Sequence, residues 1–138
     1  MNSDVNNIRN FVLAGHLACG KSTLAGALLT AMSAGEQQDV LTNMIDYMDE
    51  EKSRKMTLFA KPFRAVYSGV GGKTIEMNFI DTPGHPDFCG QVIAACYAGD
   101  VAIVVVDAVS GVQVGTINVW RRCEKLGMPC AVVITGLD

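Results

Sequence analysis

The stretch Gly15-His16-Leu17-Ala18-Cys19-Gly20-Lys21-Ser22 carries the most specific pattern in this chain, G-x-x-x-x-G-K-[ST]. It follows an apolar segment, 8–14, and precedes an alanine- and leucine-rich segment, 21–33. The first segment is predicted to be a buried strand and the second a helix that Gly35 ends. A glycine-rich loop between a strand and a helix directs consecutive backbone N–H groups at phosphate oxygens. The sequence therefore predicts a phosphate-binding loop.

Each part of this loop has an expected role. Lys21 is expected to reach the β and γ phosphates of a nucleotide, and Ser22 to offer its hydroxyl to the Mg²⁺ that bridges them. The nucleotide-binding residues are predicted to be Gly15, His16, Leu17, Ala18, Cys19, Gly20, Lys21, Ser22 and Thr23. A space-filling role is favoured for Cys19 over a reactive thiol. The alternative is a glycine-rich turn beside an ordinary surface lysine.

The rest of the chain alternates between expected strands and helices. Strands are predicted at 63–68 and 74–80, joined by a glycine turn at 69–72, and again at 101–106 and 130–134. A helix is predicted at 87–98, and Ser110 is expected to cap another that ends before Gly127 and turns Val112, Thr116, Val119 and Trp120 inward. This order predicts an α/β P-loop NTPase fold. It is a three-layer αβα sandwich with a mainly parallel sheet and one antiparallel edge strand.

The segment Asp81-Thr82-Pro83-Gly84-His85 follows a predicted strand, so it is expected beside the phosphate loop at the carboxyl ends of the strands. Asp81 is predicted to serve the Mg²⁺ through a bound water. Gly84 has an N–H that can meet a γ-phosphate, and His85 can orient the water that attacks it. The alternative for His85 is a loop histidine without a role.

A polar and charged segment, 36–61, separates the first helix from the first hairpin strand and is predicted to be mobile. Its charged run, 49–55, is interpreted as a solvated, switchable surface. Thr57 lies between this run and the strand, where it can supply a second hydroxyl to Mg²⁺. That assignment depends on its position between the other two motifs.

Composition excludes several classes of protein. The chain has 138 residues, 49% of them hydrophobic, and a formal net charge of −3. This balance predicts one well-cored domain without a direct nucleic-acid site. No membrane partner is expected, because no apolar run approaches the length of a membrane span, and the polar start favours the cytoplasm. The five cysteines form no C-x-x-C pair, so we expect reduced thiols and no zinc site.

Together these motifs resemble the N-terminal nucleotide-binding domain of translational GTPases, most of all elongation factor G and its relatives. The similarity rests on residues 7–10, 15–22, 46–47, 54–58, 81–85 and 107–112. It implies GTP or GDP as the ligand and Mg²⁺ as the cofactor. It places Thr57 in switch I and His85 in switch II, where His85 positions water once the ribosome orders it. The resemblance further implies the ribosome as partner, and GTP hydrolysis coupled to the movement of tRNA and mRNA.

Three features depart from that family's pattern. Where the family reads guanine with N-K-x-D, this chain has Thr135-Gly136-Leu137-Asp138, so only Asp138 is left to accept from the base. Ala18 stands where many relatives have an acidic residue. The family's domain continues beyond this point, so we expect residues 1–138 to be a GTP-binding domain truncated before its last strand and helix.

The sequence leaves two other functions open. A nucleotide-binding or ribosome-associated module with degenerate guanine recognition and little hydrolysis is favoured by Thr135 and Gly136. A P-loop kinase or ATPase with another base preference is opposed by the segment 81–85. The leading prediction is a Mg²⁺-dependent GTPase whose own turnover is weak, because activation normally comes from a partner.

Overall fold

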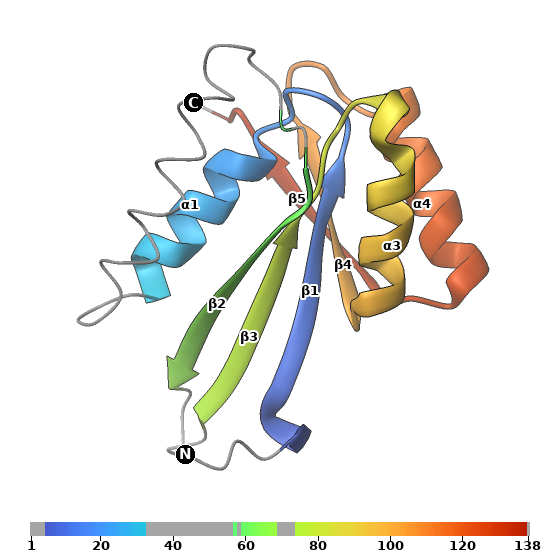
Figure 1. Ribbon diagram of the computed structural model, residues 1–138. Helices are drawn as coiled ribbons and strands as arrows, with labels where there is room; N and C mark the ends of the chain where they lie inside the picture. The colour runs from blue at the N-terminus through green and yellow to red at the C-terminus, as the bar shows by residue number, and fades with distance from the viewer. Residues whose placement is uncertain (1–4, 33–56, 58, 69–73, 138) are drawn as a thin grey trace.

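The computed structural model describes residues 5–32, 57, 59–68 and 74–137. Within them, five strands form one sheet in the order β2-β3-β1-β4-β5 (Figure 1). The strands are β1 (Ile8–Gly15), β2 (Lys61–Ser68), β3 (Thr74–Asp81), β4 (Val101–Asp107) and β5 (Cys130–Thr135). The helices are η1 (Val5–Asn7), α1 (Lys21–Met32), η2 (Pro86–Phe88), α3 (Cys89–Ala98) and α4 (Val114–Leu126).

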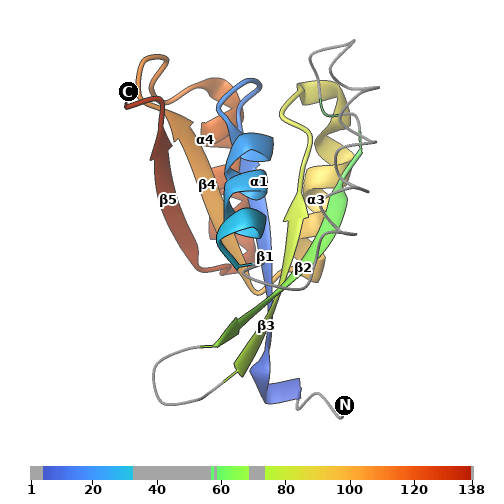
Figure 2. The ribbon, with the colours of Figure 1, turned by 90° about the vertical axis from the view of Figure 1, so that its left-hand side faces the viewer.

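The helices cover both faces of the sheet. Figure 2 shows α1 in front of the strands, with α3 and α4 behind them. β1 runs parallel to β3 and β4, and β5 runs parallel to β4, whereas β2 pairs antiparallel with β3. The predicted αβα sandwich, with a mainly parallel sheet and one antiparallel edge strand, is confirmed.

Parallel strands bring their carboxyl ends to one edge of the sheet. Gly15, Asp81, Asp107 and Thr135 are the last residues of β1, β3, β4 and β5. Ligands of open α/β sheets bind at this edge, outside the carboxyl ends of the strands. The fold therefore gathers the phosphate loop and the segment 81–85 on the same side of the molecule.

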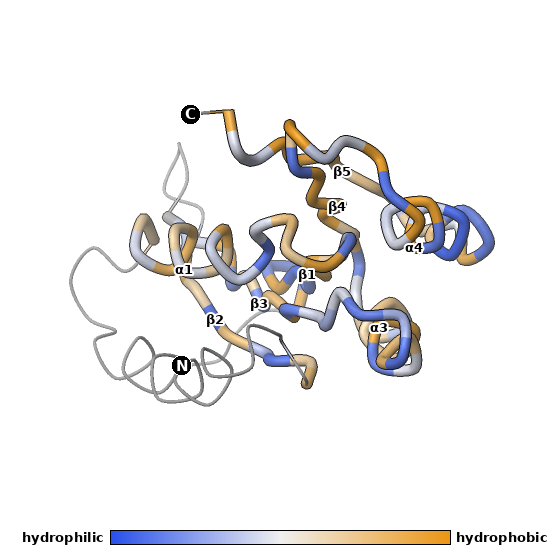
Figure 3. The backbone as a smooth tube through the Cα atoms, turned by 90° about the horizontal axis from the view of Figure 1, so that it is seen from above, coloured by the Kyte–Doolittle hydropathy of each residue, from blue (hydrophilic) through white to orange (hydrophobic). Residues whose placement is uncertain are grey.

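Two hydrophobic clusters hold the layers together. One lies on each face of the sheet, because alternate residues of a strand point to opposite faces. Under α1, Phe79 stacks between Phe11 and Phe63, with ring centroids 5.2 and 5.0 Å apart. On the other face, buried residues of β1 and β4 pack against Val119 and Cys123 of α4. Seen from above, the strands lie between α1 on one side and the pair α3 and α4 on the other (Figure 3).

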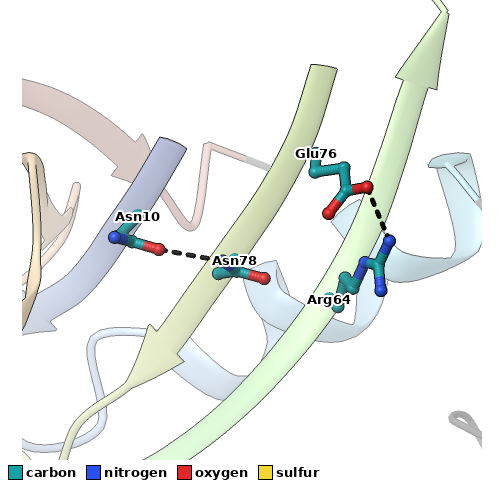
Figure 4. Close-up of polar contacts among 4 residues, drawn as sticks. All are labelled: Asn10, Arg64, Glu76 and Asn78. Atoms are coloured by element: carbon teal, nitrogen blue, oxygen red, sulfur yellow. Dashed lines mark hydrogen bonds and ion pairs between the residues drawn. The ribbon is translucent and has the colours of Figure 1, made fainter. Parts of the chain in front are cut away.

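Polar side chains link β3 to its two neighbouring strands, β1 and β2 (Figure 4). The amide of Asn78 donates to Asn10 Oδ1 over 2.9 Å, and Arg64 Nη2 lies 2.8 Å from Glu76 Oε1. The Arg64 side chain is 56% exposed, so this ion pair contributes about 1 kcal/mol at most. The apolar faces therefore set the strand register, and these polar pairs are consistent with it.

The start of α4 differs from the prediction. Its N-cap is Gln113, whereas Ser110 lies in the preceding turn and donates its N–H to Asp107 Oδ1 over 2.7 Å. The predicted cap at Ser110 is therefore wrong. Val112 is 68% exposed and Trp120 is 47% exposed, so their predicted inward orientation is wrong as well.

A later start turns a different face of α4 to the sheet. Its buried residues are Thr116, Val119 and Cys123, which repeat with helical spacing. The inward orientation of Thr116 and Val119 is confirmed. The helix ends at Gly127, whose φ of 62° is left-handed, as the sequence predicts.

The predicted helix at 87–98 also begins later than expected. The 3₁₀ turn Pro86–Phe88 comes first and α3 starts at Cys89, because His85 acts as the N-cap of that turn and accepts from the Asp87 N–H. The predicted glycine turn at 69–72 and the charged run 49–55 lie outside the described residues. In the described part of the chain, no helix is long and apolar enough to cross a membrane.

Candidate functional site

The loop between β1 and α1 holds a buried lysine. Lys21 is 5% exposed, and its ammonium donates to the carbonyl oxygens of His16 and Gly15 over 2.6 and 3.4 Å. In the same loop, Ala18 has a φ of 60°. Residues other than glycine rarely adopt this backbone conformation, and those that do are concentrated at ligand sites. The loop thus encloses a cation within its own backbone, as a phosphate cradle requires.

The second part of the site consists of three side chains with oxygen atoms, which come from distant parts of the chain. The Ser22 hydroxyl donates to Asp81 Oδ2 over 2.7 Å and lies 3.2 Å from Thr57 Oγ1. Asp81 is 2% exposed. Hydroxyl and carboxylate oxygens are the ligands that Mg²⁺ prefers. The structure therefore brings together the three residues that the sequence predicts for a metal.

Gly84 approaches the loop so closely that no side chain fits there. A Cβ atom at this position would lie 2.7 Å from Lys21 Nζ and 2.8 Å from the His16 carbonyl oxygen. The segment after β3 is anchored at its other end by Thr82, which is fully buried and donates its hydroxyl to the Leu13 carbonyl oxygen over 2.8 Å. The backbone of Gly84 is thereby held against the ammonium of Lys21.

His85 follows Gly84 and is one-third exposed. Its Nδ1 accepts from the Asp87 N–H over 3.3 Å, and its ring meets Phe88 at a centroid distance of 6.1 Å. The histidine thus lies beside the phosphate loop, held through one nitrogen.

Two contacts of the loop were not predicted from the sequence. Thr135 donates its hydroxyl to the Cys19 carbonyl oxygen over 2.9 Å, and the Gly115 N–H donates to His16 Nδ1 over 3.3 Å. The position of Thr135 at the carboxyl end of a strand could have indicated the first. The second needs the packing of α4 against the loop, for which the sequence has no signal.

The remaining predicted residues vary in placement. Cys19 is 3% exposed, and this burial is what a space-filling role predicts. Leu17 and Gly20 are partly exposed in the loop, and Thr23 is exposed on α1. Asp138 lies outside the described residues.

This geometry agrees with comparisons to known proteins. The family described as "Elongation factor Tu GTP binding domain" matches residues 6–138. The chain belongs to this family. Translational GTPases with such a domain hydrolyse GTP, and the domain binds guanine nucleotides. The predicted membership in the translational GTPases, through a GTP-binding domain, is therefore confirmed.

Relatives of this GTP-binding domain carry the name elongation factor 4. The protein of that name from Protochlamydia amoebophila is 42% identical over 136 residues, which are 98% of this chain and 22% of the relative. The one from Chlamydia trachomatis serovar L2 is 40% identical over 122 residues, 88% of this chain and 20% of the relative. The chain thus spans about a fifth of the length of these relatives.

A solved structure extends the comparison to three dimensions. A crystal structure of a Thermus thermophilus protein is similar to this chain with a TM-score of 0.79 and 37% identity. The match covers 95% of this chain and 20% of the other. This GTP-binding domain therefore has the fold of a segment of that longer protein.

Proposed function

We propose that this chain binds Mg²⁺ and GTP at the carboxyl edge of its sheet and hydrolyses the γ-phosphate, as the nucleotide-binding part of a ribosomal elongation factor. One observation carries the proposal. Ser22, Thr57 and Asp81 converge within hydrogen-bond distance, and Ser22 directly follows the buried Lys21. A phosphate-binding cation and a set of hard oxygen ligands are the two parts that phosphoryl transfer needs.

The phosphates lie in the loop 15–22, whose backbone N–H groups and the N-terminus of α1 favour negative charge. Lys21 exchanges its bonds to the carbonyls of Gly15 and His16 for the β and γ phosphates, because a phosphate oxygen is the stronger acceptor. Gly84 supplies its N–H to the γ-phosphate from the opposite side. Asp138 accepts from the guanine base.

Ser22 and Thr57 hold the metal through their hydroxyls, and Asp81 does so through a water. The Mg²⁺, when bound, neutralises charge on the β and γ phosphates. Thr57 joins this set although 35 residues separate it from Ser22. Its place beside Ser22 ties the segment before β2 to the nucleotide.

His85 orients the attacking water. Its Nδ1 accepts a hydrogen bond from the Asp87 N–H, which leaves Nε2 to contact the water. His85 can position the water only when its ring faces the γ-phosphate, and a partner holds the ring in that orientation. We therefore expect slow hydrolysis by the chain alone and faster hydrolysis on the ribosome.

The chain acts in the cytoplasm, in an elongation step on the ribosome. The resemblance to elongation factor G predicts translocation, whereas the relatives found by comparison are named elongation factor 4. The shared name supports an elongation role. Ribosome-stimulated GTP hydrolysis tests this elongation role.

A second candidate, a module with degenerate guanine recognition, is favoured by one contact. The Thr135 hydroxyl is engaged by the Cys19 carbonyl, and the next residue, Gly136, has no side chain to cover a base. Both positions that the family uses to read guanine therefore lack their usual groups. Selectivity suffers when a site has few polar groups that the wrong base leaves unpaired.

Calorimetric titration with GTP, GDP, ATP and GMP, with and without Mg²⁺, tests both candidates. Binding of GTP and GDP well above ATP supports the GTPase, and comparable weak binding of GTP and ATP supports the degenerate module. Absence of triphosphate binding refutes both.

Two variants test which residues bind the phosphates and the metal. Lys21→Ala is expected to weaken GTP binding about 10- to 100-fold while guanosine binding stays nearly unchanged, because the lost bonds are charge-assisted. Ser22→Ala is expected to abolish most of the gain in affinity that Mg²⁺ gives. Thr30→Ala, an exposed hydroxyl on the same helix, is the control for both.

A further inference from the structure

A cavity of about 410 Å³ lies between α3 and α4, on the face of the sheet opposite α1. Pockets that bind small molecules measure about 300–1,000 Å³. Gly84 and His85 line one end of the cavity, and α3 and α4 line its length. The cavity therefore adjoins the proposed nucleotide site and shares these two residues with it.

The inner wall of the cavity is apolar. Val92 and Ile93 line it from α3, and Val119 lines it from α4. Val119 is 6% exposed and Val92 packs against the core cluster, so both are fixed by the interior of the protein. A rigid apolar wall binds the body of an organic ligand by removing it from water.

The outer wall is cationic. Arg121, Arg122 and Lys125 of α4 line the cavity, and Glu124 is the carboxylate among the lining residues. The lining therefore has an excess of positive charge, although the whole chain has a net charge of −3. In the described ranges, none of these three cations forms an ion pair with another described residue.

We propose that this cavity is a binding site for a small organic anion, one with an aromatic or branched apolar body and a sulfonate, carboxylate or phosphate group. The body lies against Val92, Ile93 and Val119, and the anionic group reaches the guanidinium groups of Arg121 and Arg122. Charge complementarity favours this ligand class. A neutral ligand interacts favourably only with the apolar inner wall, and a cationic ligand is repelled by the cationic outer wall. This ligand class follows from the lining of the cavity and does not rest on the proposed GTPase function, although Gly84 and His85 belong to both sites.

The probe for this site is 8-anilinonaphthalene-1-sulfonate, an aromatic sulfonate whose fluorescence rises when it leaves water. We expect one saturable site on the folded 138-residue chain. The uncharged analogue N-phenyl-1-naphthylamine is expected to bind about tenfold more weakly or worse, because it cannot make charge-assisted hydrogen bonds. Equal affinity for the two probes would overturn the anion selectivity, and binding of several probe molecules would overturn a defined site.

Cys89 gives a readout tied to this place. It lines the cavity and is exposed, whereas Cys19, Cys96 and Cys123 are buried and Cys130 is partly buried. Saturating sulfonate probe is expected to slow alkylation of Cys89 by iodoacetamide at least several-fold, as followed by peptide mass spectrometry. An unchanged alkylation rate with the probe bound would place the probe elsewhere and sink the proposal.

Variants complete the test. Arg122→Glu is expected to weaken probe binding about tenfold or more, whereas Arg9→Glu, the same charge change on β1, leaves it within about twofold. Ile93→Trp fills the cavity and is expected to abolish both binding and protection of Cys89. Circular dichroism checks that each variant is folded. Equal effects of the changes at Arg122 and Arg9 would reduce the binding to net charge and refute the site.

Discussion

The hydroxyl of Thr135 donates a hydrogen bond of 2.9 Å to the carbonyl oxygen of Cys19, across 116 residues of sequence. Thr135 ends β5, and Cys19 lies in the loop between β1 and α1. The same hydroxyl is 3.3 Å from the carbonyl oxygen of Val106 in β4. One side chain thus ties the carboxyl ends of two strands to the phosphate loop, so the loop's shape depends on the far end of the sheet.

Replacing this hydroxyl is expected to loosen the loop. Thr135→Val keeps the branched shape but leaves the Cys19 carbonyl without this donor, at a cost of about 1–2 kcal/mol in the free energy of unfolding. GTP affinity is expected to fall in parallel. Urea unfolding and calorimetry measure the two effects. Thr135→Ser should retain both properties, and Thr30→Val, which loses an exposed bond within α1, is the control. Equal losses in the variants at Thr135 and Thr30 would contradict the tie.

The approach of Gly84 to Lys21 leads to a second prediction. Gly84→Ala places a methyl group 2.7 Å from the ammonium and 2.8 Å from the backbone at His16 and Leu17, so the two segments must separate. We expect GTP binding to weaken by at least tenfold, as a calorimetric titration will measure, because the γ-phosphate contact from Gly84 is displaced. Gly90→Ala, in open space on α3, is expected to leave binding unchanged. Normal GTP binding by the variant at Gly84 would show that this approach has no role.

His85 is expected to act on the water and not on the bound nucleotide. His85→Ala should leave GTP affinity within about twofold and lower ribosome-stimulated hydrolysis by about 100-fold or more, since an interaction used only in the transition state changes rate alone. Single-turnover hydrolysis on ribosomes measures the rate. Asp87→Asn, which removes the carboxylate 3.5 Å from His85 Nδ1, is the control and should have a small effect. Loss of GTP binding in His85→Ala would refute the proposed role.

Much of the fold follows from local sequence patterns. The apolar strand, the glycine-bounded loop and the alanine-rich helix around Lys21 each agree with the structure, because each pattern is satisfied within a few residues. Ser22 and Asp81 could be predicted for the same reason, since each belongs to a motif, whereas Thr57 could be predicted only from its position between these two motifs. Their meeting point could be expected from the rule that parallel strands end at one edge.

What the sequence did not predict depends on packing between distant elements. A serine before a helix is a good cap in isolation, but Ser110 is engaged by Asp107 in the turn, so α4 begins at Val114. That shift decides which face of α4 is buried. The contact between Gly115 and His16 and the cavity beside α3 both depend on where α4 then lies, so neither has a local signal.

Asp107 is expected to make stability depend on pH. Hydrogen bonds from Ser110, first from its hydroxyl and then from its backbone N–H, lower the pKa of Asp107 below its ordinary value of 3.8. Its stabilising effect is therefore present above that value and is lost as the pH falls through the lower pKa of the folded state. Asp107→Asn lacks this dependence. Urea unfolding from about pH 6 to pH 2.5 should show the difference between wild type and variant narrowing as the pH falls. A constant difference would contradict the prediction.

Gly136 stands where the related family has lysine, and its backbone shows why a side chain is disfavoured there. Its φ is 66°, and a Cβ atom would lie 2.6 Å from Asp107 Oδ2. Gly136→Ala is therefore expected to lower the free energy of unfolding by about 1–2 kcal/mol, the strain of a left-handed residue, and Gly136→Lys to lower it as well. Gly26→Ala is the control. It lies in open space within α1, and helix propensity predicts a gain of about 0.5–1 kcal/mol there. Urea unfolding of the three variants should thus give two losses and one gain. A gain at position 136 would mean that the turn after β5 relaxes freely, and a lysine could then be restored there to cover the base.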